Sequence, residues 1–388
     1  MDRNFHIMFE GRWVIKMEHQ KTNIRVLIIN TVRFRLNGIS SVIMNYFRQM
    51  NKDGIYTDFV VTNEISNEYR KELEGYGSSI YCFSKKKNPF IYIKQINDLL
   101  STNHYDVIHV HGNSALMVIE ALLAKNNKVP VRIVHSHNTT CTHTILHKML
   151  YPLFARSYTK GLACGRDAGK WLFRGNEFEV LVNGIDLEKF RFNYSVRKDY
   201  RKKLGVEEGE VLIGHVGNFV KQKNHEFLID IFMELHKKDS RFKLLLVSDG
   251  VLVERIKDKV SSLGLTDAVI FYGKSTHVQN LYQAMDVFVL PSLNEGLPIV
   301  LIEAQAAGVK CLVSETVTKE VKMTDLVEFL PIINPTDWLN RILPILMDKQ
   351  DDRMKRCLDA QKEISSCGYD IKQNADKLRN IYLNSSIY

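Results

Sequence analysis

The residues best suited to chemistry lie in the segment Pro291–Ala304 (PSLNEGLPIVLIEA), which follows an apolar run and leads into a helical pattern. Two carboxylates, Glu295 and Glu303, enclose seven residues that include Gly296 and Pro298. Pro298 suits the first turn of a helix, because its missing N–H has no partner there. The free N–H groups of that turn and the helix dipole together form an anion site. The spacing predicts a bound phosphate at the helix start, with Glu303 in reach of a ribose hydroxyl. The plainer alternative is a helix-start carboxylate followed by a solvated glutamate.

Histidines form a second group of candidate residues. Seven of the 13 histidines fall within residues 104–147, including His109-x-His111 and His135-x-His137 at the ends of two apolar runs. Alternate residues on a strand share a face, so a metal site has to be considered. Neither His-Glu-x-x-His nor Asp-x-Asp occurs in the chain. We therefore predict no metal ion, with His111 and His137 lining a cleft and His109 and His135 in the core.

Two series of short apolar runs, each alternating with helix-length segments, must position these residues. Such alternation predicts βαβ units and a parallel sheet in each series. The first series of predicted strands is Ile24–Asn30, Tyr56–Val61, Ser79–Phe83, Asp106–Val110, Arg132–Ser136 and Gly161–Cys164. The second series is Val211–Val216, Lys243–Ser248, Ala268–Phe271, Val287–Leu290 and Lys310–Val313. In such sheets ligands bind beyond the carboxyl ends of the strands, where the candidate residues lie.

The fold class predicted from these series is α/β, with two doubly wound, Rossmann-like domains that face a cleft and a helical C-terminal tail. Residues 183–210 are polar and predict a linker with a short helix. The expected parts are an N-terminal extension (1–23, with Met17 as an alternative start), two domains (24–195 and 196–368) and a helix (369–388) that crosses back to the first domain.

Charge is distributed unevenly along the chain. Residues 1–200 hold 28 Lys and Arg against 18 Asp and Glu, whereas residues 201–388 hold 25 against 26. This asymmetry indicates a surface in the first half that meets an anionic partner such as nucleic acid, membrane or a phosphorylated substrate. The six cysteines are scattered, which favours reduced thiols in a cytoplasmic protein. No apolar run approaches the roughly 20 residues that span a bilayer.

Several motifs resemble one known family. EGLPIVLIE resembles the E-x7-E signature of the retaining GT-B glycosyltransferases of family 4, which includes capsule, exopolysaccharide and lipopolysaccharide sugar transferases. Four further segments resemble its motifs in the same order: VHSHNTT (134–140), VLVNGIDLEKF (180–190), HVGNFVKQKNHEFLI (215–229) and LLLVSDG (244–250). The resemblance spans about residues 24–385, and it implies a GT-B fold and sugar transfer from a nucleotide-diphospho-sugar, by family frequency a UDP-sugar and next a GDP-sugar.

The resemblance implies catalytic roles for three residues. Lys223 matches the lysine on the donor diphosphate, Glu295 the glutamate facing the transferred sugar, and His137 the histidine near the reaction centre. Glu303 matches the glutamate that holds the ribose. No side chain is an evident base, so the leaving phosphate oxygen is expected to take the acceptor's proton, with retention of configuration and without a metal or other cofactor.

Further donor-binding positions are carried over in the same way. Asn37 and Gly38 match the first loop over the diphosphate, and Gly273 and Lys274 lie where the family seats the base. The donor-binding set is completed by Asn218, Gly296, Leu297, Pro298 and Ile299.

The chain departs from the family pattern at two places. Asn218 replaces the arginine that accompanies the lysine, and Ser248-Asp249-Gly250 replaces the commoner G-x-G turn. We hypothesise that Arg33 or Arg35, which with His111 are expected to line the acceptor side of the cleft, supplies the missing cation.

The basic first half would be the acceptor half. Cations and apolar residues alternate over residues 148–174, which predicts either a peripheral contact with anionic lipid or two ordinary amphipathic helices. The expected acceptor is a polysaccharide or lipid-linked saccharide at the inner face of the plasma membrane. The alternatives are a nucleotide-sugar epimerase of the same fold and a basic protein that binds nucleic acid or membrane without catalysis. A nicotinamide-dependent enzyme is disfavoured because no G-x-G-x-x-G follows a strand.

Overall fold

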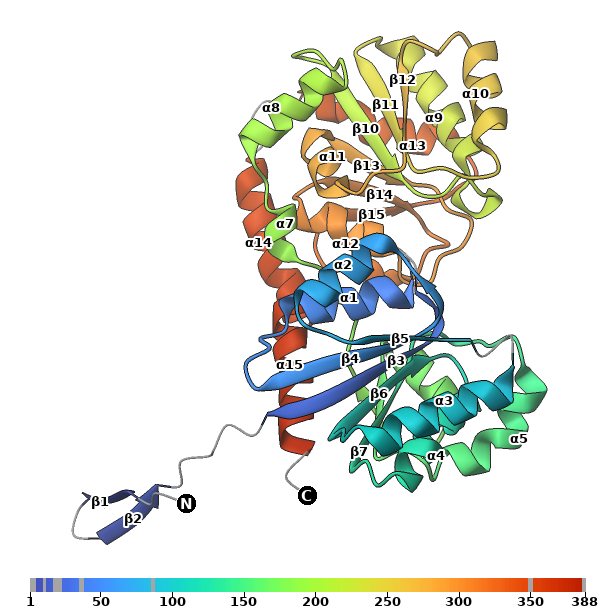
Figure 1. Cartoon of the computed structure of the whole chain (residues 1–388). Coiled ribbons are helices and arrows are strands. Elements are labelled where there is room, and N and C mark those ends of the chain that lie inside the picture. The colour runs from blue at the N-terminus through green and yellow to red at the C-terminus, as the bar shows by residue number, and fades with distance from the viewer. Residues whose placement is uncertain are drawn as a thin grey trace. The chain divides into compact units, whose positions relative to one another are not determined.

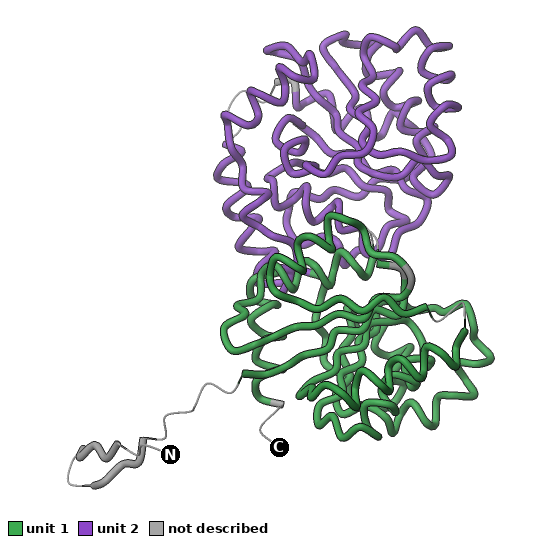
Figure 2. Tube along the Cα trace, viewed as in Figure 1, with its two compact units in different colours: residues 1–183, 371–388 green, residues 184–370 purple. Residues whose placement is uncertain are grey.

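The computed structural model describes residues 5–9, 12–16, 23–34, 38–84, 88–347 and 352–385. The chain divides into two compact units, residues 1–183 with 371–388 and residues 184–370 (Figure 2). The division therefore precedes the expected boundary at 195. Helices α7 (Leu187–Phe190) and α8 (Tyr194–Lys203) pack on the second unit, where the Arg197 guanidinium pairs with Asp286 at 2.5 Å. Much of the polar segment read as a linker is thus helical and part of the second unit.

The first unit is built on a seven-stranded parallel sheet with the order β5-β4-β3-β6-β7-β8-β9 (Figure 1). Its strands are β3 (Ile24–Phe34), β4 (Ile55–Ile65), β5 (Ile80–Phe83), β6 (Val107–Gly112), β7 (Val131–Ser136), β8 (Lys160–Ala163) and β9 (Glu179–Val180). All six strands predicted in this half are present. The two-residue strand β9 was not predicted, because so short a segment carries no periodic pattern.

Helices cover both faces of this sheet. They are α1 (Ile39–Gln49), α2 (Asn67–Gly75), α3 (Pro89–Thr102), α4 (Val118–Asn126), α5 (Thr144–Phe154), α6 (Arg166–Phe173) and α15 (Ile371–Ser385). Side chains of α1, α2 and α15 share a core with Val26 and Ile28, and those of α3, α4 and α6 share one with Leu27 and Ile29. The alternation along β3 therefore builds two cores, one on each face.

The second unit is a six-stranded parallel sheet with the order β12-β11-β10-β13-β14-β15. Its strands are β10 (Val211–Val216), β11 (Phe242–Val247), β12 (Val269–Gly273), β13 (Val287–Leu290), β14 (Lys310–Ser314) and β15 (Val327–Leu330). Its remaining helices are α9 (His225–Lys238), α10 (Val253–Ser262), α11 (Val278–Ala284), α12 (Ile299–Ala306), α13 (Pro335–Ile342) and α14 (Arg353–Ser366). The fold class is therefore confirmed, and β15 is an additional edge strand.

Each sheet has one switch point, where strands that are neighbours in space lead away in opposite directions. It lies between β3 and β6 in the first unit and between β10 and β13 in the second. The segments that follow these strands carry most of the predicted site residues, so the topology brings them to one edge of each sheet.

The N-terminal extension contains an antiparallel pair, β1 (Phe5–Phe9) and β2 (Arg12–Lys16), ahead of the first predicted strand. Within the described ranges of the chain, no helix is long and apolar enough to cross a membrane.

Candidate active site

Lys223 and Glu295 meet at the switch point of the second unit. Lys223 ends a 3₁₀ turn (Lys221–Lys223) between β10 and α9, and its Nζ donates to Glu295 Oε1 at 2.5 Å. The two side chains are only 16% and 11% exposed. An ion pair so shielded from water keeps much of its Coulomb attraction. The predicted catalytic cation and carboxylate of this unit are therefore in direct contact.

The loops that carry this pair are connected by one main-chain hydrogen bond and one hydrogen bond from a side-chain amide. Leu293 N donates to Gln222 O at 2.8 Å, and Gln222 Nε2 donates to Asn294 O at 2.8 Å. Gly217, directly after β10, leaves room for the lysine, because a Cβ there would lie 3.2 Å from Lys223 Cδ. The segment thus fixes the lysine over the edge of the sheet.

Glu303 lies inside the first two turns of α12 and is held by a tyrosine from α11. Tyr282 Oη contacts Glu303 Oε2 at 3.1 Å and Val300 O at 2.9 Å. Burial raises the pKa of Glu303 to about 7, and the Tyr282 hydroxyl opposes that rise. The carboxyl group therefore titrates near neutral pH. In its ionised form it can accept a hydrogen bond from a hydroxyl group.

The amino end of α12 is open. Pro298 precedes the helix and is buried, Gly296 is exposed, and no side chain caps the first turn that begins at Ile299. Leu297 packs against the core of the unit. The free N–H groups of this turn lie between Glu295 and Glu303 in the chain, which places an anion-binding terminus beside both carboxylates.

Asn218 contacts Ser248, the other residue that departs from the family pattern. Ser248 Oγ donates to Asn218 Oδ1 at 2.8 Å, across the loops that follow β10 and β11. Gly273 has a φ of 78° and its carbonyl accepts from Ser248 N at 2.9 Å. Lys274 is largely exposed and its Nζ lies 3.3 Å from Asp249 Oδ2. The second unit therefore gathers its predicted donor-binding residues along the carboxyl edge of one sheet.

Two predicted residues of the first unit also meet. His111 ends β6, His137 follows β7, and His111 Nδ1 lies 2.9 Å from His137 Nε2. Burial lowers the pKa of His137 to about 3, and burial and the neighbouring imidazoles hold the pKa of His111 well below its usual range. Both rings are therefore neutral at physiological pH and can exchange a single hydrogen bond.

His109 and His135 are buried behind this pair, with His109 Nδ1 2.7 Å from the hydroxyl of Tyr382 on α15. Ligand atoms of His109, His111 and His135 lie within 4.8 Å of one another. The rings of His109 and His135 are stacked, 3° from parallel. The three imidazoles therefore form a buried cluster, and the absence of a metal ion from it stays a prediction.

The first loop of this unit is described only in part. Gly38 has a φ of 57° and precedes α1, whose first turn has no side-chain cap. Arg35 and Asn37 lie outside the described residues, and of Arg33 only the backbone is described. The hypothesis that Arg33 or Arg35 replaces the missing cation stays a prediction.

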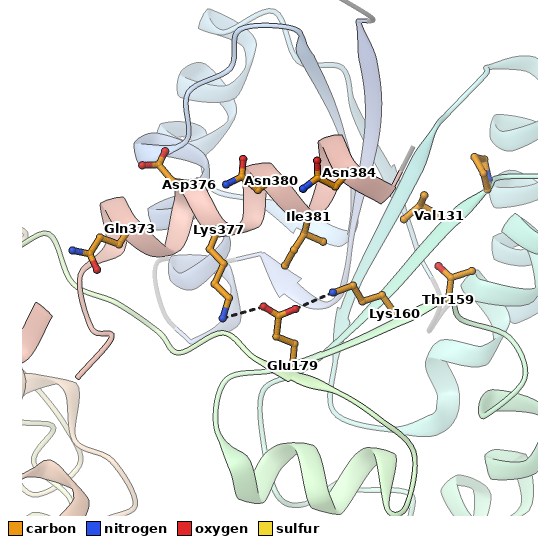
Figure 3. Close-up of a pocket in the computed structure, with 11 residues that line it drawn as sticks. Val131, Thr159, Lys160, Glu179, Gln373, Asp376, Lys377, Asn380, Ile381 and Asn384 are labelled. Carbon is orange, nitrogen blue, oxygen red and sulfur yellow. Dashed lines mark ion pairs between the residues drawn. The ribbon is translucent and has the colours of Figure 1, made fainter. Parts of the chain in front are cut away.

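A cavity of about 820 Å³ lies at the opposite edge of the first sheet, between α15 and the amino ends of β7, β8 and β9 (Figure 3). Glu179 bridges Lys160 at 2.8 Å and Lys377 at 3.0 Å there. None of the predicted site residues lines this cavity. It lies at the amino ends of the strands, away from the carboxyl edge of the sheet.

The sequence analysis did not identify three residues of these hydrogen-bond networks: Tyr282, Gln222 and Tyr382. Tyr282 and Tyr382 reach their partners from helices that are distant in sequence, and only their place in a helical pattern is visible in the sequence. Gln222 stands beside Lys223, but its contact with the opposite loop depends on tertiary packing.

Comparison with known proteins places the chain in a family. Residues 36–189 match the family profile described as "Glycosyltransferase Family 4", and residues 196–356 match "Glycosyl transferases group 1". A putative glycosyltransferase, EpsF of Bacillus subtilis, is 32% identical over 361 residues, covering 89% of this chain and 93% of that protein. The UDP-Gal:alpha-D-GlcNAc-diphosphoundecaprenol alpha-1,3-galactosyltransferase of Escherichia coli is 27% identical over 74% of this chain and 77% of its own.

Solved structures agree on the fold. Anabaena Alr3699/HepE in complex with UDP superposes with a TM-score of 0.74 at 17% identity, over 93% of this chain and all of that chain. A glycosyltransferase from Rickettsia africae superposes with a TM-score of 0.76 at 16% identity, over 94% and 98%. The two parallel sheets, the ordered motifs and the relative that aligns over nearly the whole chain lead to one conclusion: the chain belongs to glycosyltransferase family 4 and is a glycosyltransferase of the GT-B fold.

Proposed function

We propose that this glycosyltransferase transfers a sugar from a UDP-sugar to a hydroxyl of a polysaccharide or lipid-linked saccharide, with retention of anomeric configuration. The observation that carries the proposal is the Lys223–Glu295 pair at the switch point of the second unit, with Glu303 and the open end of α12 beside it. UDP is supported by the UDP complex of the structural neighbour, and the acceptor by the galactosyltransferase relative named above.

The residues divide the work by their chemistry. Lys223 offers a mobile positive charge that stabilises negative charge on the leaving phosphate, and the N–H groups of α12 add a fixed dipole. Glu303, when ionised, accepts hydrogen bonds from the ribose hydroxyls. Glu295 is released from the lysine as the diphosphate binds, and it then faces the transferred sugar.

The acceptor hydroxyl attacks C1 from the face that the diphosphate leaves. The C1–O bond to the phosphate breaks, the new glycosidic bond forms, and the acceptor proton passes to the departing phosphate oxygen. The neutral pair His111 and His137 orients hydroxyls in the acceptor unit. Because charge stabilisation comes from Lys223 and backbone N–H groups, we propose that no metal ion is required.

A direct assay tests this function. The protein is incubated with UDP-, GDP- or ADP-sugars and a lipid-linked saccharide in the presence of EDTA, and the anomeric proton of the product is followed by NMR. We expect transfer from a UDP-sugar with an unchanged anomeric coupling constant. An inverted product would contradict retention, activity lost only in EDTA would contradict metal independence, and conversion of donor without acceptor would indicate an epimerase.

We further propose that the first unit touches an anionic membrane, at the inner face of the plasma membrane, through α5. The aromatic residues of residues 148–174 do not support this contact, since Phe154 and Phe173 are buried and belong to the core. Instead, α5 exposes an aliphatic stripe. Ile145 and Met149 are 76% and 70% exposed, and Leu153 continues their spacing of four residues.

Lys148 and Arg156 are exposed at the same helix and its end. An apolar stripe flanked by cations is suited to the boundary between anionic headgroups and acyl chains. The net positive charge of the first half of the chain supports the same contact.

A further inference from the structure

We propose that Ser248 is a positioning residue for donor binding: its hydroxyl holds the Asn218 amide so that Nδ2 offers an uncharged hydrogen bond to the donor diphosphate. The inference rests on the proposed function, because it names how that function's diphosphate is held. The two residues that depart from the family pattern, Asn218 in place of arginine and Ser248 in place of glycine, would then act together as one pair.

Backbone hydrogen bonds connect the two loops that carry Asn218 and Ser248. Phe219 N donates to Asp249 O at 3.0 Å, and Leu252 N donates to Phe219 O at 3.0 Å. Gly250 lies so close that a Cβ would come within 2.7 Å of Phe219 N and O. The distance between positions 218 and 248 is therefore set by the backbone, and their side chains must meet.

Ser248 occupies a backbone conformation that favours glycine. Its φ is 129°, and Gly250, two residues later, has a φ of 159°. Glycine reaches such angles without steric cost, whereas serine is strained there. What serine supplies in exchange is the hydroxyl that donates to Asn218 Oδ1 at 2.8 Å. Strain that persists in this way is typical of functional sites.

In this hydrogen bond the amide of Asn218 presents its oxygen to Ser248. With Oδ1 engaged by Ser248, the Nδ2 group is turned away from the serine, and Asn218 is exposed. In the described part of the chain Nδ2 contacts no acceptor. Asn218 shares the loop between β10 and α9 with Lys223, so its free donor lies on the segment that carries the phosphate-binding lysine.

An amide donor in place of a guanidinium removes one positive charge from the site. A phosphate oxygen still receives a hydrogen bond, but Lys223 remains the only cation among the predicted diphosphate ligands of the described second unit. Nucleotide affinity should therefore depend less on ionic strength than it would with an arginine at position 218. The amide can serve only if it is held in place, because a freely rotating side chain presents its oxygen as often as its nitrogen.

Calorimetric titration with UDP, GDP and ADP tests the inference. For the nucleotide that binds, Ser248→Ala and Ser248→Gly should each weaken affinity by about threefold to tenfold, the loss of one oriented hydrogen bond. Asn218→Ala should weaken it similarly, and adding Ser248→Ala to Asn218→Ala should change nothing further. In turnover assays the Ser248 variants should raise KM for the donor and leave kcat nearly unchanged.

Thermal stability measurements distinguish a positioning role of Ser248 in donor binding from a purely structural role. Ser248→Gly relieves the backbone strain and should raise Tm while it weakens nucleotide binding, whereas Ser248→Ala keeps the strain and should not raise Tm. The pair Asn218→Arg with Ser248→Gly restores the family residues and should bind more tightly, with a steeper salt dependence.

The inference is overturned if nucleotide binds normally to both Ser248 variants, or if Ser248→Ala weakens binding equally with and without Asn218. Either result would leave the proposed function intact. A wild-type protein that binds none of the three nucleotides would contradict the nucleotide donor itself, and the inference with it.

Discussion

Lys223 is the residue whose substitution tests the site most directly. Lys223→Ala removes the cation that we propose stabilises the leaving phosphate, and losing one preorganised electrostatic contact typically costs about 10²- to 10³-fold in turnover. We expect that loss in kcat/KM, measured as initial rates of sugar transfer. Lys221→Ala is the matched control, because Lys221 is an exposed lysine in the same 3₁₀ turn. Near wild-type rates for Lys223→Ala would contradict the assignment.

Glu303 links stability to pH. Its pKa is raised from 4.5 to about 7 in the folded protein, so the native state favours the neutral carboxyl. The resulting stabilisation is fully present below pH 4.5 and is lost as the pH rises through 7, by up to about 3 kcal/mol. We therefore expect Glu303→Gln to gain stability relative to wild type between pH 4.5 and 8, in urea unfolding followed by circular dichroism.

Tyr282→Phe provides the counterpart. The tyrosine hydroxyl lowers the pKa of Glu303 in the folded protein. Its removal should therefore extend the pH-dependent loss of stability to higher pH. Identical pH profiles for wild type and Glu303→Gln would show that this carboxyl does not titrate in the neutral range.

At the residue scale the sequence singled out the four histidines from their places in strand patterns, the two glutamates from their spacing around a helix start, and Lys223 from the family resemblance. It treated Asn218 and Ser248 as separate departures. Only the structure places the two side chains in contact, since the register of two loops decides which residues meet.

At the scale of elements, α5 makes the membrane proposal testable. Ile145→Glu with Met149→Glu places two carboxylates in its apolar stripe. Each side chain is worth roughly 1.5–3 kcal/mol when removed from water, so partitioning onto phosphatidylglycerol vesicles should fall by at least tenfold. Ile333→Glu serves as the control, because Ile333 is as exposed and lies in the second unit. Absence of wild-type binding to these vesicles would refute the contact.

The helical patterns around residues 148–174 illustrate what a sequence leaves open. A stripe of apolar residues on a helix fits either a core or a membrane, because both remove it from water. In α6, Leu172 and Phe173 face the core, whereas α5 buries His147 and Phe154 and exposes Ile145 and Met149. Which face packs inward depends on the sheet beneath, and that sheet is a tertiary feature.

At the scale of the whole molecule, each unit carries its own cores. The two large hydrophobic clusters of residues 184–370 contain no residue of the first unit. We expect a fragment of these residues to unfold cooperatively and to bind UDP, as seen by thermal melting and calorimetry. Residues 1–183 alone should not, because Ile371, Leu378 and Tyr382 complete a core of the first unit. A fragment 1–183 with a native-like melting transition would contradict this dependence.

The division of the chain was harder to predict than its fold class. Repeated βα units reveal two doubly wound sheets, but α7 and α8 lie between the last strand of one sheet and the first strand of the other, so the sequence does not show which sheet they join. Leu187 and Phe190 of α7 join a hydrophobic core of the second unit, and Arg197 and Arg201 of α8 pair with Asp286, about 85 residues away in the chain.

The return of α15 to the first sheet has a consequence for biosynthesis. Because this helix follows residues 184–370 in the chain, the unit that begins first on the ribosome receives its last structural piece only after the other unit has been made. The second unit can thus be completed while one face of the first unit's sheet still lacks its covering helix. A nascent chain interrupted before residue 371 would expose apolar residues of the first unit's sheet to chaperones and proteases, which couples the lifetime of the protein to α15.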